Sequence, residues 1–212
     1  MRKRISAFCL LFFTVTVNSS NAQFQNVLID QFASETTIAI DPQNTNLQVA
    51  GSNLTNYYYS SDAGATWTNS TLSSTWGNYG DPNVVNDGAG NWHYFHLSNQ
   101  IDRIVCQSSN TFPPVWSTGT HTGNTPPPFL QAHEWAYADW SNHASYTTRT
   151  QYDQYPQQLP TDSSHIHFSA SYDQGLTWTP AQRLDERGGD VNYSDVIDPR
   201  PATDEQGNVY VS

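Results

Sequence analysis

One eight-residue sequence occurs twice in the chain and constrains its fold more than any other feature. Residues 60–67 (SSDAGATW) and 171–178 (SYDQGLTW) share the pattern Ser-x-Asp-x-Gly-x-Thr-Trp. Ser and Asp side chains bond to nearby backbone N–H groups in turns, and glycine adopts backbone angles that other residues resist. Threonine and tryptophan suit a strand that leaves such a turn. Each copy follows a strand-like segment, residues 54–59 or 165–170, so both copies are predicted to be hairpin turns.

The rest of the chain reads as many short strands separated by turns. Apolar residues alternate over short runs such as 37–40 (TIAI), 93–97 (HYFHL) and 208–211 (NVYV), and clusters of Gly, Pro, Asn, Asp and Ser separate them. This pattern is typical of an all-β sandwich, barrel or propeller.

A longer repeat favours the propeller. Residues 81–94 and 198–210 share the order Asp-Pro, short strand, Asp-x-x-Gly-Asn, strand, and weaker copies begin at Glu35 and His133. The second Asp of each unit falls at 41, 87, 139 and 204, at intervals of 46, 52 and 65 residues, which is the size of a propeller blade with loop insertions. Each unit is predicted to form two inner strands, a third strand, a turn and a fourth strand. Residues 141–163 are expected to be a long insertion in the third unit.

The octapeptide resembles the Asp-box, or BNR repeat, of the sialidase (neuraminidase) superfamily. The resemblance implies an all-β, sialidase-like β-propeller built of four-stranded antiparallel blades. Family members have six blades, so residues 23–212 would be a partial propeller, an incomplete N-terminal portion of about three and a half blades. In that family the Asp-box is a surface turn remote from the catalytic centre. Asp62 and Asp173 are therefore expected to be structural.

The N-terminus predicts export. Residues 1–22 have a basic start, an apolar segment over residues 5–17 and small residues before Gln23, as a signal peptide does, and the apolar run is too short to span a membrane. We expect a secreted protein, extracellular or periplasmic. Cleavage would leave five arginines against 19 acidic residues, a net charge of −14 that argues against a nucleic-acid partner. It would also leave Cys106 as the single cysteine, predicted to be a small buried residue.

Polar residues stand where the first strand of every unit begins. In the family the active site lies where these strands meet around a central channel. Converging carboxylates there would serve acid–base chemistry or bind a cation or sugar hydroxyls, whereas the alternative is that they cap strands or open turns. We predict binding residues, without assigning a catalytic one, at Glu35, Asp81, His133, Glu134, Asp198 and Arg200.

The catalytic pattern of true sialidases is not found in the first unit. Those enzymes carry an Arg on the first inner strand and an acid/base Asp in the loop after the second, whereas residues 35–40 (ETTIAI) hold no Arg and residues 51–56 (GSNLTN) no Asp. Two functions therefore remain open. One is an exo-acting glycoside hydrolase of the sialidase type, and the other is a non-catalytic surface propeller that binds glycan or protein. We expect a glycan or glycoprotein partner, and no cofactor, metal or membrane span. An acidic channel mouth would suit a cation or neutral sugar better than sialic acid, unless Arg200 supplies counter-charge.

Overall fold

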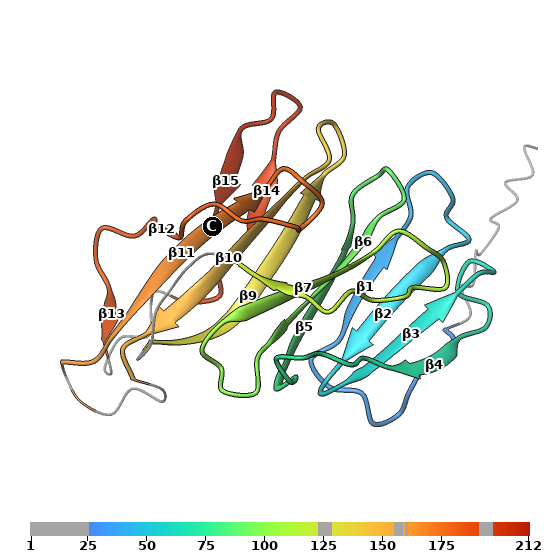
Figure 1. Ribbon diagram of the computed structural model, residues 1–212, viewed down its shortest axis with the longest axis horizontal. Coiled ribbons are helices and arrows are strands. Elements are labelled where there is room, and N and C mark those ends of the chain that lie inside the picture. The colour runs from blue at the N-terminus through green and yellow to red at the C-terminus, as the bar shows by residue number, and fades with distance from the viewer. Residues whose placement is uncertain (1–25, 123–128, 155–158, 160, 191–196) are drawn as a thin grey trace, which may run out of the picture.

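The computed structural model describes residues 26–122, 129–154, 159, 161–190 and 197–212, and over these residues the chain is all-β (Figure 1). The predicted signal peptide lies outside the described residues. Within the described ranges no helix is long and apolar enough to cross a membrane. The first sheet contains β1 (Thr37–Ile40), β2 (Gln48–Ser52), β3 (Asn56–Ser60) and β4 (Thr68–Thr71); the second contains β5 (Gly80–Asn86), β6 (Trp92–Leu97), β7 (Ile104–Ser109) and β8 (Thr120–His121); the third contains β9 (Leu130–Asp139), β10 (Ala144–Tyr152), β11 (Ser163–Ser171) and β12 (Gln182–Arg183), with β13 (Gly189–Asp190) paired to β11; and the fourth contains β14 (Pro201–Thr203) and β15 (Val209–Val211).

The sheets are arranged like propeller blades. Within each sheet the strands pair antiparallel and follow chain order, except that β13 pairs with β11. The first strands of successive sheets are neighbours, because β1 contacts β5, β5 contacts β9 and β9 contacts β14, and Figure 1 shows the sheets lying side by side. The predicted four-stranded antiparallel units are therefore confirmed for the first three sheets, and the fold is propeller-like.

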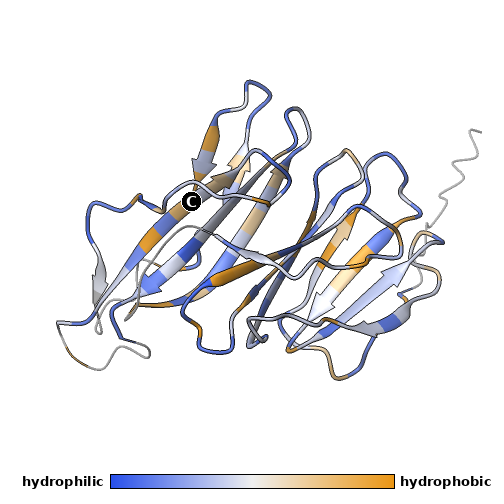
Figure 2. Ribbon diagram, in the orientation of Figure 1, coloured by the Kyte–Doolittle hydropathy of each residue, from blue (hydrophilic) through white to orange (hydrophobic). Residues whose placement is uncertain are grey.

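Apolar side chains fill the spaces between adjacent sheets. Figure 2 shows hydrophobic residues gathered on the strands and hydrophilic residues in the connecting loops. Trp92 and Tyr94 belong to a cluster that joins the first two sheets, while Phe95 and Cys106 of the second sheet pack with Ala136 of the third. Cys106 is 1% exposed, and burial raises the pKa of its thiol to about 12. The prediction that it is a small buried residue is confirmed.

Both octapeptides form the predicted turn between the third and fourth strands of a sheet. Ser60 Oγ accepts the Gly64 N–H at 2.9 Å, and the Asp62 carboxylate accepts the Thr66 N–H at 2.8 Å and its hydroxyl at 2.6 Å. Residues 171–178 repeat the same bonds. The Thr66 bonds are the main reason why the pKa of Asp62 falls to about 2. The two box aspartates hold turns together, and neither lines the pocket described below.

The expected insertion over residues 141–163 is mostly wrong. Its first half is β10, the second strand of the third sheet, which pairs with β9 and β11 and is buried along its whole length. The sequence of β10, ASYTTRTQY, lacks the aliphatic alternation that marks a buried strand. Its interior is polar instead: Arg149 donates to Gln131 Oε1 at 3.0 Å and to Ser169 Oγ at 3.3 Å.

Candidate functional site

A pocket of about 290 Å³ lies where the first strands of the four sheets begin. All six residues predicted from the sequence line it: Glu35, Asp81, His133, Glu134, Asp198 and Arg200. The structure therefore brings together residues that are spread over more than 160 positions of the chain. We call this cavity the mouth pocket. That its lining binds a ligand stays a prediction.

Four of these residues share an unusual backbone conformation. The φ angles of Glu35, Asp81, His133 and Asp198 are 48°, 51°, 53° and 55°, in the left-handed region that non-glycine residues seldom occupy. In the second and third sheets the pairing register also shifts at this point, between Gly80 and Asn83 and opposite Arg149. Such strain and such bulges gather at functional sites, where they redirect side chains. Each of the four lies six residues before the second Asp of its unit, at 41, 87, 139 or 204, and the shared conformation confirms that the four positions are equivalent.

Hydrogen bonds and one ion-pair contact join the four positions into one polar arc. The side-chain amide of Asn53 donates to Glu35 Oε2, and its Oδ1 accepts the backbone N–H of Asp81 at 2.9 Å. Asp81 Oδ2 in turn accepts the backbone N–H of His133 at 3.1 Å. His133 Nδ1 lies 2.7 Å from Asp198 Oδ1. Each sheet thus holds the strained residue of the next one in place.

Glu134 differs from its neighbours in the lining. It is 5% exposed, and within the described part of the chain neither carboxyl oxygen has a hydrogen-bond partner. Burial, reinforced by the charge of Asp81, raises its pKa well above the ordinary value. The side chain therefore favours its protonated form, and its acidic proton has no acceptor among the described residues.

Asp81 interacts electrostatically with both the buried Glu134 and the exposed Glu35. Burial raises its pKa, the bond from the His133 N–H opposes that shift, and the charge of Glu35 adds to it. The mouth pocket thus combines a buried carboxyl group that keeps its proton with carboxyl groups that are more open to water. Carboxyl groups whose environments differ in this way are suited to act as an acid and a base in one reaction.

An aromatic ring and a guanidinium complete the rim. Trp135 is 41% exposed and lines the pocket, and the Arg200 guanidinium stacks over its ring, 4.6 Å from the centroid. Exposed indole rings serve as platforms for the apolar face of a sugar. Here Arg200 covers one face of the ring, so the platform carries a positive charge within a mainly acidic lining.

The six predicted residues line one pocket, but sequence reasoning missed other residues at this place. It did not include Asn53 or Trp135, although Asn53 lies between β2 and β3, in the segment where the sialidase resemblance would place an Asp. The position of Asn53 in this segment was the sequence signal that could have identified it. Among the described residues no group of three or more His, Cys, Asp or Glu side chains is placed to hold a metal ion.

Similarity to known proteins is found among solved structures. No protein-family model matches the sequence, and no curated protein matches it significantly. Among solved structures, the chain is similar to an endo-arabinase from Bacteroides thetaiotaomicron VPI-5482, with 14% sequence identity and a TM-score of 0.42. The likeness covers 84% of this chain and 87% of that one. A likeness this distant does not indicate a function, which must be inferred from the residues of the mouth pocket.

Proposed function

We propose that the mouth pocket binds a glycan and cleaves a glycosidic bond, with Glu134 as the proton donor. One observation carries the proposal: Glu134 lines the pocket as a buried carboxyl group without a hydrogen-bond partner among the described residues, and its environment raises its pKa. A general acid must hold its proton at the working pH and must be free to give it to the leaving oxygen. Glu134 meets both conditions.

Glycoside hydrolysis also requires a second carboxylate. Glu35 and Asp81 both line the pocket and are bridged by the Asn53 amide, which fixes the Glu35 carboxylate and the Asp81 backbone. One of the two activates water or attacks the anomeric carbon directly. Parallel tests of Glu35→Gln and Asp81→Asn identify which one does so.

The lining points to a neutral sugar. It holds four carboxyl groups and a single arginine, so an anionic sugar meets repulsion that Arg200 offsets only in part. The two Asp-box turns support a sialidase-like propeller with exo-glycosidase activity, which makes a sialoside the necessary comparison substrate. An exported sialidase-like protein would meet glycans that carry neutral sugars or sialic acid outside the cell.

The test is turnover of aryl glycosides of neutral sugars and of a sialoside by the full chain. We expect hydrolysis of a neutral glycoside, lost in Glu134→Gln and in one of the two second-carboxylate variants. Glu205→Gln is the matched control, because Glu205 is an exposed glutamate in the β14–β15 turn, away from the pocket. Turnover that survives Glu134→Gln unchanged would refute the assignment of the acid.

The exposed Trp135 favours a second candidate, a glycan-binding module without catalysis. An array of immobilised glycans, probed with the wild-type chain and with Trp135→Ala, separates the two functions. Binding that depends on Trp135, in a protein that turns over no glycoside, would establish the binding module and exclude the enzyme.

Export is a separate proposal, supported by the sequence of residues 1–22. The chain expressed in a bacterial host with a general secretion system is expected to appear outside the cytoplasm with Gln23 as its first residue. N-terminal sequencing of the purified product checks the cleavage site. Product that keeps Met1 and stays in the cytoplasm would contradict the signal peptide.

A further inference from the structure

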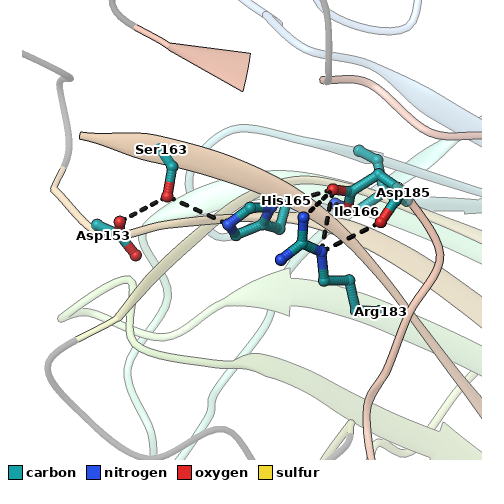
Figure 3. A network of polar contacts seen from close by, with 6 residues as sticks. All are labelled: Asp153, Ser163, His165, Ile166, Arg183 and Asp185. Carbon is teal, nitrogen blue, oxygen red and sulfur yellow. Dashed lines mark hydrogen bonds and ion pairs between the residues drawn. The ribbon is translucent and has the colours of Figure 1, made fainter. Parts of the chain in front are cut away.

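A second group of polar side chains lies on β11 and on the segments that follow β10 and β12 in the third sheet, and none of its members lines the mouth pocket. Ser163 and His165 stand two residues apart on β11 and so share one face of the sheet. Ser163 Oγ lies 3.1 Å from His165 Nε2, and His165 Nδ1 lies 3.0 Å from Asp185 Oδ2 (Figure 3). A hydroxyl, an imidazole and a carboxylate are thus connected in sequence within hydrogen-bond distance.

Asp185 is held firmly as the last member of this series. Its side chain is 9% exposed, its Oδ1 accepts the Ile166 N–H at 2.7 Å, and Arg183 Nη2 lies 2.9 Å from its Oδ2. Burial raises the pKa of this carboxyl group, but the bonds from His165, Ile166 and Arg183 outweigh burial, and the net pKa is lowered. Asp185 therefore stays a carboxylate at neutral pH.

A carboxylate at Nδ1 fixes the tautomer of His165. In the tautomer with its proton on Nδ1, the ring donates to Asp185 and the lone pair of Nε2 points toward Ser163. Gly188 packs against the edge of the ring, where an added Cβ would lie 2.4 Å from His165 Cε1. The ring is thus fixed in position as well as in tautomer.

We propose that Ser163, His165 and Asp185 form a second catalytic site, one that hydrolyses esters of small carboxylic acids. A nucleophile within reach of a base, with the base oriented by a third group, is the arrangement that activates a serine hydroxyl, and it is recognised by geometry whatever the fold. Ser163 and His165 are the catalytic residues, and Asp185 is a positioning residue. The proposal does not depend on the glycosidase activity of the mouth pocket.

The reaction proceeds in two steps, acylation of Ser163 and hydrolysis of the acyl-serine. Ser163 Oγ attacks the ester carbonyl carbon while its proton passes to His165 Nε2, and the carbon–oxygen bond to the alcohol then breaks as His165 returns the proton to the leaving alkoxide. Water attacks the resulting acyl-serine, again giving its proton to His165. The tetrahedral intermediate formed by this attack then collapses and releases the carboxylic acid, while His165 returns its proton to Ser163 Oγ and restores the hydroxyl.

Asp153 competes with His165 for the serine proton. The Ser163 hydroxyl donates to Asp153 Oδ2 at 2.6 Å, a shorter contact than the one to His165. Asp153 is exposed, so an alanine is tolerated there. Asp153→Ala leaves His165 as the neighbouring acceptor and is expected to raise the reactivity of Ser163 several-fold.

The test uses a fluorophosphonate probe and p-nitrophenyl acetate on the full chain. We expect the probe to label Ser163, as mapped by mass spectrometry of the wild-type protein, a measurement that requires no variant to fold. Ser163→Ala and His165→Gln are expected to lower ester turnover by about 10³-fold, toward the uncatalysed rate. Asp185→Asn is expected to lower kcat and leave KM unchanged, because Asp185 orients the base and does not touch the ester.

Ser61→Ala is the matched control, because Ser61 is an exposed serine in the first octapeptide. It is expected to leave labelling and turnover unchanged. Wild-type protein that the probe does not label at Ser163 overturns the proposal, as does ester turnover that persists in Ser163→Ala. An Asp153→Ala variant no more reactive than wild type contradicts the competition between the two acceptors.

Discussion

Replacing Glu134 with glutamine is expected to lower glycoside turnover by about 10²–10⁴-fold and, at the same time, to stabilise the folded protein at neutral and alkaline pH. The turnover falls because the amide cannot donate the proton that the leaving oxygen requires. The stability rises because the amide removes a group whose ionised form is disfavoured by burial and by the charge of Asp81. A substitution with these two opposite effects separates catalysis from folding.

The pH dependence is set by the direction of the pKa shift. The folded protein holds the Glu134 proton more tightly than the unfolded chain, whose carboxyl titrates near its ordinary value of 4.5. Folding stability is therefore highest below that value and falls as the pH rises from 4.5 through the raised pKa of the folded state. Glu134→Gln should flatten this decline.

Thermal melts of both proteins between about pH 4 and pH 9, with kcat measured on the same samples, check the prediction. Glu205→Gln, at an exposed site, is expected to follow the wild-type curve. Melting profiles of wild type and Glu134→Gln that run parallel over this range would contradict a raised pKa at Glu134.

Gly175→Val is expected to destabilise the protein by about 3–5 kcal/mol, since backbone strain and overpacking act together. Gly175 has a φ of 79°, which a β-branched residue resists. Its turn also packs against the second sheet: an added Cβ would lie 2.9 Å from Ser108 Oγ and 3.1 Å from Cys106 Sγ. Since Cys106 belongs to the core between the sheets, the clash cannot be relieved by moving an exposed side chain.

Two further glycines separate the cost of backbone strain from the cost of overpacking. Gly64 has the same place in the first octapeptide and a φ of 82°, but its added Cβ would come closest to the end of the flexible Gln48 side chain, at 3.0 Å. Gly207, with a φ of 79°, has no atom within 4 Å of that point. In chemical denaturation, the loss in free energy of unfolding should be largest for Gly175→Val, smaller for Gly64→Val and smallest for Gly207→Val. The loss for Gly207→Val is expected to be about 1–2 kcal/mol, because only backbone strain contributes there. Equal losses at all three sites would show that packing against the second sheet contributes nothing.

The sequence predicts the repeated features of this protein well because each depends on local chemistry. The octapeptide specifies its turn through bonds between residues two and four apart, as Ser60 and Asp62 show. Equal spacing from the turn aspartates then places Glu35, Asp81, His133 and Asp198 at one structural position. A repeat of this kind carries fold information without any knowledge of distant contacts.

Features that depend on one sheet packing against another could not be predicted. β10 is buried although its residues are mostly polar, and its Arg149 bonds to Gln131 and Ser169 of the neighbouring strands, which no pattern within residues 144–152 reveals. Nothing local distinguishes His133 from Glu134, yet one has the strained backbone and the other the buried carboxyl group. The bulge that separates their roles arises from pairing with β10.

Four equivalent positions of the mouth pocket have left-handed backbone angles, and this limits which residues can replace the acidic ones. A replacement that tolerates these angles changes the charge of the pocket without changing its backbone. Asparagine tolerates this backbone region better than most residues, and it nearly matches aspartate in shape. Asp81→Asn and Asp198→Asn, singly and together, therefore remove one negative charge at a time while keeping the conformation that the arc requires. Because Asp81 is also a candidate for the second carboxylate, the series is read by sugar binding and not by turnover, and it would show at which charge an anionic sugar begins to be bound.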